Sequence, residues 1–290
     1  MKILIDNYSS LTTTEPMYLD TCLNQTQGSV QSILWNTSQV SAFDAIDKVN
    51  PDVILLSSVS RSVPDVVKYL KQSAHKIDLV LNTTQLKNEE IEKLESYLTE
   101  NNVKPLCFID NSYFSKKSKT KLNTLYPAAD LFVNHNVQFY NLQAAILTNS
   151  TSNVDLVKEQ SSAYETYHKF MLSQETSDEF DKNMSLFEFN KISNNYANVV
   201  IVGDIDFVFS QVFFDNLLRS NKVLVKTKDT EKYNKILIDL FNQEETEDIS
   251  SLLKKQVMKK HTCYNRATRL LRMLKCENAA AILESARESA

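Results

Sequence analysis

The chain of 290 residues contains only two glycines, Gly28 and Gly203. Average glycine usage of about 7% would give roughly twenty. Dinucleotide-binding loops and P-loops need glycines at fixed positions within one short loop, so both kinds of loop are excluded. A phosphate group would have to be held by helix N-termini, by Ser, Thr or Asn loops, or by basic side chains.

Long hydrophobic runs and metal-binding motifs are also missing. No apolar run reaches the roughly 18 residues of a transmembrane helix, and the first residues are too short a hydrophobic stretch for a signal peptide. The four cysteines and four histidines are scattered, without C-x-x-C or H-x-x-x-H spacing, so no metal site is predicted. We therefore expect reduced thiols and a cytoplasmic protein without membrane contact.

The charge balance is ordinary for a globular protein. Hydrophobic residues make up 42% of the chain and charged residues 23%, and the length of 290 residues is enough for two domains or one large one. The net charge of -4 argues weakly against DNA or another polyanion as partner.

Strand and helix patterns alternate along the first half of the chain. The strands are nearly continuous apolar runs, which indicates a parallel sheet buried on both faces. We predict a Rossmann-like domain over residues 1–150. The predicted strands cover 3–5, 30–34, 53–56, 77–81, 106–109, 131–133 and 144–147, and the predicted helices cover 15–23, 40–49, 64–72 and 87–101.

The second half begins after a polar stretch, 148–160, which we interpret as a linker. We predict a smaller α/β domain over 151–290 with a helical C-terminal tail, so the fold class is α/β with two Rossmann-like halves. The predicted strands cover 169–172, 199–202 and 223–225, and the predicted helices cover 185–192, 210–219, 229–242, 245–258, 261–275 and 277–290.

The segment 198–227 has the size of one β-α-β unit. Ligands of parallel sheets bind beyond the carboxyl ends of the strands. We therefore expect chemistry between Gly203 and Gln211. The Asp204-Ile205-Asp206 triplet either holds a divalent ion or, as the more ordinary alternative, is the polar end of a surface strand. Asp215, farther along the predicted helix, either contacts a ribose or is a structural residue near the helix N-terminus.

Two further segments, in the first half of the chain, also follow the carboxyl end of a predicted strand. The loop from Asn7 to Thr14 follows the first strand and precedes a helix, so its hydroxyls either hold a polar ligand or only cap the turn. Asp110 ends the fifth strand and either acts as a general base or caps the next turn.

A basic stretch near the C-terminus has no acidic residue between 251 and 275. It either contacts a polyphosphate or nucleic acid or is a solvated helix face. Its members are Lys254, Lys255, Lys259, Lys260, Arg266, Arg269, Arg272 and Lys275.

Short blocks resemble GT-B-type glycosyltransferases, namely the CgeB-like transferases and the phage DNA glucosyltransferases. The resemblance covers about a third of the chain, and its most specific block is H-T-C-Y-N-R-A-T-R-L-L at 261–271. The other blocks are T-T-E-P-M-Y-L at 13–19, F-I-D at 108–110, and V-F-F-D-N-L at 212–217 followed by V-L-V at 223–225.

The resemblance implies a nucleotide sugar as donor substrate, bound by the second half, and an acceptor bound by the first half. The resemblance implies no other cofactor and no metal. The similarity to the phage enzymes in particular implies DNA as a possible acceptor and the host cytoplasm as the location. The implied catalytic residues are Asp110 and Glu15, and the implied donor-binding residues are Gly203, Asp204, Gln211, Asp215 and Arg266.

Two departures from the family pattern leave a second possibility open. The family arginine that contacts the donor phosphate falls on Val212, and the family glycine after the helix is replaced by Ser220-Asn221. The alternative to a glycosyltransferase is therefore a non-catalytic protein that uses the same fold as a binding or assembly module.

Overall fold

The structure is a computed structural model that describes the chain except residues 8–12, 85, 111–118, 126, 133–141, 176, 220–221, 242–249 and 290. The chain folds into two compact units. Unit 1 comprises Met1–Ser9, Glu15–Tyr126 and Cys263–Ala290, and unit 2 comprises Ser10–Thr14 and Pro127–Thr262.

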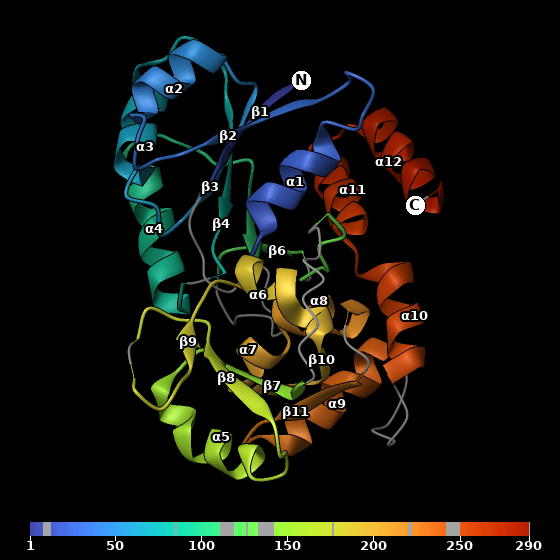
Figure 1. The fold of residues 1–290 in the computed structure, drawn as a ribbon. Coiled ribbons are helices and arrows are strands. Elements are labelled where there is room, and N and C mark those ends of the chain that lie inside the picture. Colours follow the sequence, from blue (N-terminus) through green and yellow to red (C-terminus); the bar gives the residue numbers. More distant parts are fainter. Residues whose placement is uncertain are drawn as a thin grey trace. The chain divides into compact units, whose positions relative to one another are not determined.

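Unit 1 is built on a six-stranded parallel sheet with the strand order β2-β1-β3-β4-β5-β6 (Figure 1). Its strands are β1 (Lys2–Asp6), β2 (Gln31–Trp35), β3 (Val53–Ser57), β4 (Asp78–Asn82), β5 (Cys107–Asp110) and β6 (Leu122–Thr124). Its helices are α1 (Glu15–Leu23), α2 (Ala42–Val49), α3 (Val63–Gln72), α4 (Asn88–Glu100), α11 (Cys263–Met273) and α12 (Glu277–Ser289).

Helices cover both faces of this sheet, which explains its continuous apolar strands. Helices α2, α3 and α4 lie on one face, and α1 and α11 lie on the other, with α12 packed on α11 (Figure 1). Alternate residues of a strand therefore enter different cores. Leu4 belongs to the core under α2 and α3, whereas Ile3 and Ile5 point the opposite way, and all three side chains are at most 1% exposed.

Unit 2 is built on a five-stranded parallel sheet with the order β11-β10-β7-β8-β9. Its strands are β7 (Leu142–Thr148), β8 (Tyr167–Met171), β9 (Lys182–Asn183), β10 (Tyr196–Val202) and β11 (Lys222–Lys226). Its helices are α5 (Val154–Ser161), α6 (Leu186–Ile192), α7 (Ile205–Val208), α8 (Gln211–Arg219), α9 (Thr230–Phe241) and α10 (Ser250–Lys260), with 3-10 turns η1 (Thr151–Asn153) and η2 (Ser193–Asn195).

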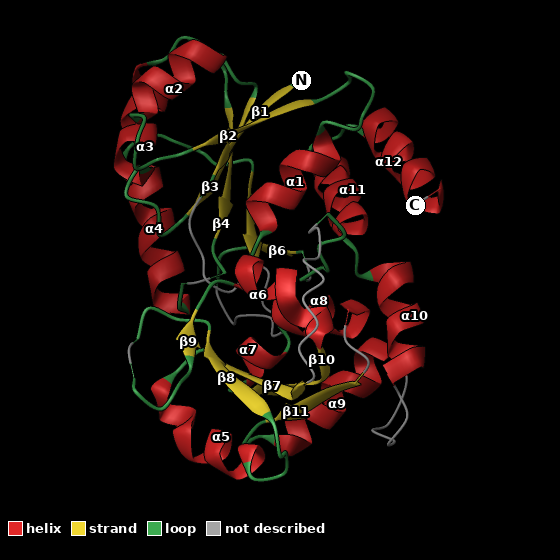
Figure 2. Cartoon of the chain, in the orientation of Figure 1, coloured by secondary structure: helices red, strands yellow, loops and turns green. Residues whose placement is uncertain are grey.

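Helix α8 is the central helix of unit 2. Its residues from Gln211 to Leu217 are all buried, and it packs against the sheet strands β10 and β11 and against α6, α7 and α10. Helix α5 covers the other face, where Val157 contacts a core that includes Ile146 and Val200. Figure 2 shows the alternation of strands and helices in each unit.

The predicted fold class is confirmed, because each unit is a parallel sheet between helices. The predicted unit β10-α8-β11 is also confirmed, since β10 and β11 are adjacent and parallel. The division into units differs from the predicted one at residue 150. Strand β7 pairs with β8 and β10 of unit 2, and α11 and α12 belong to unit 1 because the apolar stripe of α11, which includes Leu270 and Leu271, packs on α1.

Two local predictions differ from the structure, and some short elements were not predicted. The linker prediction for 148–160 is wrong, because the hydroxyl of Ser150 caps η1 and α5 follows at once. The strand prediction for 131–133 is wrong at Leu131 and Phe132, where Asp130 turns the chain by accepting a hydrogen bond from the amide of Phe132 at 2.9 Å; residue 133 lies outside the described residues. Short elements such as β6 and α7 were not predicted.

Candidate functional site

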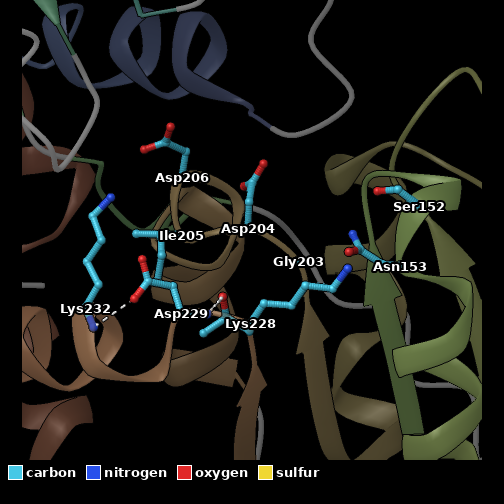
Figure 3. Close-up of a pocket in the computed structure, with 10 residues that line it drawn as sticks. Ser152, Asn153, Gly203, Asp204, Ile205, Asp206, Lys228, Asp229 and Lys232 are labelled. Atoms are coloured by element: carbon cyan, nitrogen blue, oxygen red, sulfur yellow. Dashed lines mark hydrogen bonds between the residues drawn. The ribbon is translucent and has the colours of Figure 1, made fainter.

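The second sheet has a switch point between β7 and β10. The chain leaves β7 toward β8 on one side, and later returns through β10 on the other side. Diverging connections leave a crevice at the carboxyl ends of such strands. A pocket of about 410 Å³ lies there, formed by residues that follow β7, β10 and β11 (Figure 3). Its lining residues are Ser152, Asn153, Gly203, Asp204, Ile205, Asp206, Thr227, Lys228, Asp229 and Lys232.

The segment after β10 turns at Gly203 and enters α7. A Cβ atom at position 203 would lie 2.6 Å from Cδ1 of Phe207, so only glycine allows this close approach. The carboxylate of Asp204 accepts a hydrogen bond from the amide of Phe207 at 2.8 Å and caps α7. The alternative that the triplet is the polar end of a strand is therefore wrong, because Asp204 caps α7 and Asp206 lies in its first turn.

The segments after β11 and β7 also end in helical turns at the pocket. The carboxylate of Asp229 accepts a hydrogen bond from the amide of Lys232 at 3.2 Å, in the first turn of α9. The hydroxyl of Ser150 accepts from the amide of Ser152 at 3.2 Å at the start of η1. Amide groups at a helix start carry partial positive charge, and the start of α9 brings such charge to the edge of this pocket.

Charged side chains of both signs line the pocket. Lys228 is exposed and makes no hydrogen bond or ion pair with any described residue, and Figure 3 shows its side chain extending toward Asn153. Lys232 provides a second cation, and three aspartates, Asp204, Asp206 and Asp229, provide carboxylates. The pocket thus combines cations that suit phosphate with carboxylates that accept hydrogen bonds from hydroxyl groups.

Asp215 lies outside the pocket lining, in a buried polar cluster of unit 2. Its side chain is 0% exposed. Its oxygens accept hydrogen bonds from the amide of Asp130 at 2.7 Å and from Nδ2 of Asn190 at 2.5 Å, and Arg219 forms an ion pair with it at 3.2 Å. Burial raises the pKa of Asp215 to about 6, although Arg219 acts in the opposite direction.

Gln211 belongs to the same cluster and joins two segments of unit 2. Its Nε2 donates to the hydroxyl of Thr14 at 2.7 Å and to Asp215 at 3.2 Å, and its Oε1 accepts from the amide of Thr14 at 2.9 Å. The Thr14 hydroxyl in turn donates to Asp130 at 2.6 Å. Gln211 is 3% exposed, so its hydrogen bonds hold the chain around Thr14 against α8.

Glu15 and Arg266 form a buried ion pair in unit 1. The guanidinium also donates to the carbonyl oxygen of Leu125, so Arg266 fixes α1 and the segment after β6 onto α11. Arg272, which also lies on α11, forms a surface ion pair with Glu284 at 2.9 Å. Arg266 is therefore not part of a solvated basic face, whereas the other seven basic residues of the stretch are exposed.

Asp110 ends β5 in unit 1 and is 2% exposed. Its carbonyl oxygen accepts a hydrogen bond from the amide of Leu125 at 3.0 Å. Residues 111–118 after it, residues 8–12 of the loop after β1, and residues 220–221 lie outside the described residues.

Of the residues predicted for a site, Gly203 and Asp204 line the pocket, whereas Gln211 and Asp215 lie in the buried cluster of unit 2. Glu15, Asp110 and Arg266 belong to unit 1. Sequence reasoning missed Lys228, Asp229 and Lys232, although their place just after a predicted strand was a usable signal. Within the described part of the chain, no group of three or more His, Cys, Asp or Glu side chains could hold a metal ion, and no helix is long and apolar enough to cross a membrane.

No protein-family model and no curated protein matches the chain. Among solved structures it is similar to the glycosyltransferase SsfS6 of a Streptomyces species in complex with thymidine diphosphate, with 13% identity and a TM-score of 0.43 over 100% of both chains. It is also similar to a putative UDP-N-acetylglucosamine 2-epimerase of Listeria monocytogenes, with 10% identity and a TM-score of 0.48 over 100% of this chain and 97% of that one.

A third similar structure is the UDP-GlcNAc 2-epimerase of Neisseria meningitidis bound to UDP-GlcNAc, with 9% identity and a TM-score of 0.42 over 100% of both chains. All three TM-scores are below 0.5, so the fold class rests on the strand order of the two sheets. Each unit of this chain is a Rossmann-like α/β unit with a parallel sheet.

Proposed function

We propose that unit 2 binds a nucleoside diphosphate sugar in the pocket after β7, β10 and β11, and that the protein is a glycosyltransferase that uses this donor. One observation carries the proposal: the pocket lies at the switch point of a parallel sheet and contains a cation, Lys228, that has no partner among the described residues. Parallel sheets bind ligands at such points. The volume of about 410 Å³ is within the range of small-molecule sites.

In this proposal each part of the donor has a complementary group. The diphosphate would face Lys228, Lys232 and the start of α9, because these supply positive charge. Ribose or sugar hydroxyls would donate hydrogen bonds to the carboxylates of Asp204, Asp206 and Asp229. The two lysines would also stabilise the diphosphate as it leaves, so the proposal includes no metal ion.

The proposed transfer is a single displacement. Asp110 is proposed as the base that removes the proton from an acceptor hydroxyl, while the acceptor oxygen attacks the anomeric carbon. The bond from the anomeric carbon to the diphosphate breaks, and the diphosphate takes the electron pair. The resemblance to phage enzymes makes a hydroxylated base in DNA one acceptor to test.

Calorimetric titration with UDP, thymidine diphosphate and UDP-GlcNAc tests the donor site. We expect Lys228→Ala to weaken binding by about tenfold or more, because it removes one charge-assisted hydrogen bond. The matched control is Lys235→Ala, which removes an exposed lysine from α9 outside the pocket lining and should leave binding unchanged. If no nucleotide binds the wild type, or if both variants bind equally well, the proposed site is wrong.

A second candidate function is nucleotide binding without transfer. It is favoured by the placement of Gln211, Asp215, Glu15 and Arg266, because these residues of the resemblance are all buried and occupied with internal partners. A binding module would bind the nucleotide sugar and release no free nucleoside diphosphate with any acceptor. An enzyme would release it, and Asp110→Asn would slow that release by at least about a hundredfold.

A further inference from the structure

The sheet of unit 2 has an edge strand, β11, that pairs with a neighbour on one side only. In the strand order β11-β10-β7-β8-β9 it is the end strand, parallel to β10 (Figure 1). The amide of Gly203 donates to the carbonyl oxygen of Lys226 at 3.1 Å, so the backbone of Lys226 faces β10. Successive residues of a strand turn their backbone groups to alternate sides. The backbone of Leu224 therefore also faces β10, whereas that of Val223 and Val225 faces outward.

The outward backbone groups of β11 have no hydrogen-bond partner in the part of the chain that the structure describes. No described residue forms a hydrogen bond with the amide or the carbonyl oxygen of Val223 or Val225. The three central residues of the strand, from Val223 to Val225, are half-buried, so the strand reaches the surface. An edge strand with unpaired backbone groups can add a further strand from another chain.

The other ends of the two sheets are protected from such addition. Strands β6 and β9 have only three and two residues. On β2 the side chain of Asn24 closes the edge, because its Oδ1 accepts from the amide of Ser32 at 2.9 Å and its Nδ2 donates to the carbonyl oxygen of Ser32 at 3.2 Å. Native proteins protect edge strands by such means. β11 has five residues and no such cap among the described side chains, so it is the edge best suited to bind another chain.

Lysines stand at both ends of β11 and select what can pair with it. Lys222 and Lys226 are exposed and form no ion pair with a described residue. Antiparallel pairing of two copies of β11 about Leu224 would place Lys222 opposite the partner's Lys226, and like charges directly opposite each other destabilise a sheet. A strand with carboxylates at these two positions forms opposite-charge pairs instead. The charge of the edge therefore favours an acidic partner over a second copy of this chain.

We propose that the β11 edge binds an extended acidic segment of a partner protein as an added strand. The backbone of Val223 and Val225 would form the main-chain hydrogen bonds that give such additions their affinity. Lys222 and Lys226 would pair with two carboxylates that are four residues apart in the partner, which gives specificity. The proposal goes beyond nucleotide binding, and none of these four residues lines the pocket. Nucleotide titration therefore reports on the proposed function, and peptide titration reports on the edge.

Amide hydrogen exchange followed by NMR on the full chain tests whether the edge is open. We expect fast exchange at Val223 and Val225 and slow exchange at Leu224, whose amide faces β10 and is the internal control. The probe is the synthetic peptide Thr-Glu-Val-Thr-Val-Glu-Thr with blocked ends, and its addition should slow exchange at both valines. Slow exchange at the valines of the free protein would overturn the proposal, because the edge would then already be covered.

Calorimetric titration with the same peptide measures the affinity, and we expect a Kd of about 1 mM or tighter. The double variant Lys222→Glu/Lys226→Glu should bind the peptide about tenfold or more weakly, and should bind a peptide with lysines in place of the glutamates. Val225→Pro removes an outward amide that β10 does not use, and it should also weaken binding. Lys182→Glu is the matched control, because Lys182 is an exposed lysine on β9 at the opposite end of the same sheet.

Each outcome decides the proposal. Weaker binding in the charge-reversed variant and in Val225→Pro, with unchanged binding in Lys182→Glu, supports it; if Val225→Pro does not fold, the charge-reversed variant alone decides. No binding of the acidic peptide by the wild type overturns the proposal. Equal binding of a peptide with proline in place of one valine also overturns it, since charge alone would then hold the peptide. A dimer in sedimentation velocity that the charge-reversed variant loses would show that a second copy occupies the edge.

Discussion

Two buried groups of unit 2, His261 and Asp215, should give the stability of the protein opposite pH dependences in one range. His261 is 8% exposed and stacks on Phe214 with ring centroids 5.1 Å apart. Burial, with a contribution from the charge of Lys260, lowers the pKa of His261 from 6.5 to about 4. Burial raises the pKa of Asp215 from 3.8 to about 6.

The signs follow from proton uptake in the unfolded chain. Between pH 6.5 and 4 the unfolded chain protonates His261 while the folded protein does not, so the stabilisation present at neutral pH is lost as the pH falls. Over about the same range the folded protein binds a proton at Asp215 that the unfolded chain lacks, so stability is gained as the pH falls. One pKa unit corresponds to about 1.4 kcal/mol, so each effect is about 3 kcal/mol and the two nearly cancel.

His261→Phe tests this reasoning, because phenylalanine keeps an aromatic ring against Phe214 and removes the titration. Urea unfolding followed by far-UV circular dichroism gives the unfolding free energy of both proteins between pH 4 and 6.5. We expect the free energy of the wild type, relative to the variant, to rise by about 3 kcal/mol with increasing pH over this range. A change below about 1 kcal/mol would show that His261 is not held neutral, and its ring-proton NMR signals would then titrate near pH 6.5.

Other substitutions test the packing and the buried ion pair. Gly203→Ala should destabilise the protein by about 1–3 kcal/mol, because its Cβ would meet the buried ring of Phe207; thermal unfolding unchanged from the wild type would contradict the close packing. Glu15→Gln should cost about 3–5 kcal/mol, since it leaves the guanidinium of Arg266 buried beside a neutral partner. The exposed pair offers the comparison, because Glu284→Gln at Arg272 should cost less than about 1 kcal/mol. Equal losses in the two glutamate variants would refute the assignment of Glu15 to a buried pair.

Local patterns were sufficient to predict most of the fold. Strands β1, β3 and β10 are buried on both faces, so nearly all of their residues are apolar. Such continuous apolar runs are typical of parallel sheets, which is why the sequence predicts these strands. The sequence could not show which sheet each strand joins. The run at β7 is as apolar as the others, and its assignment to unit 2 depends on pairing with strands that occur later in the chain.

The sequence predicted only those residues of the candidate site that directly follow a clearly recognisable strand. Gly203 and Asp204 follow an unmistakable strand, and both line the pocket. Asp215 looks equally functional in the sequence, yet its carboxylate is neutralised by Arg219, four residues away on the same helix. The difference between Asp204 and Asp215 is that Asp215 is buried. Its partners Asn190 and Asp130 are distant in the sequence, so no local pattern could show that they surround Asp215.

The place of α11 in the fold has a consequence for biosynthesis. Helix α1 is made early, but it packs against α11, and Glu15 meets Arg266 only after the whole of unit 2 has left the ribosome. Most of unit 2 is one continuous segment, from residue 127 to 262, which can fold as soon as it emerges. Unit 1 is therefore expected to complete its fold after unit 2, although all strands of its sheet are synthesised first. Until α11 is made, the buried side of α1 and the carboxylate of Glu15 lack the partners that they have in the folded protein.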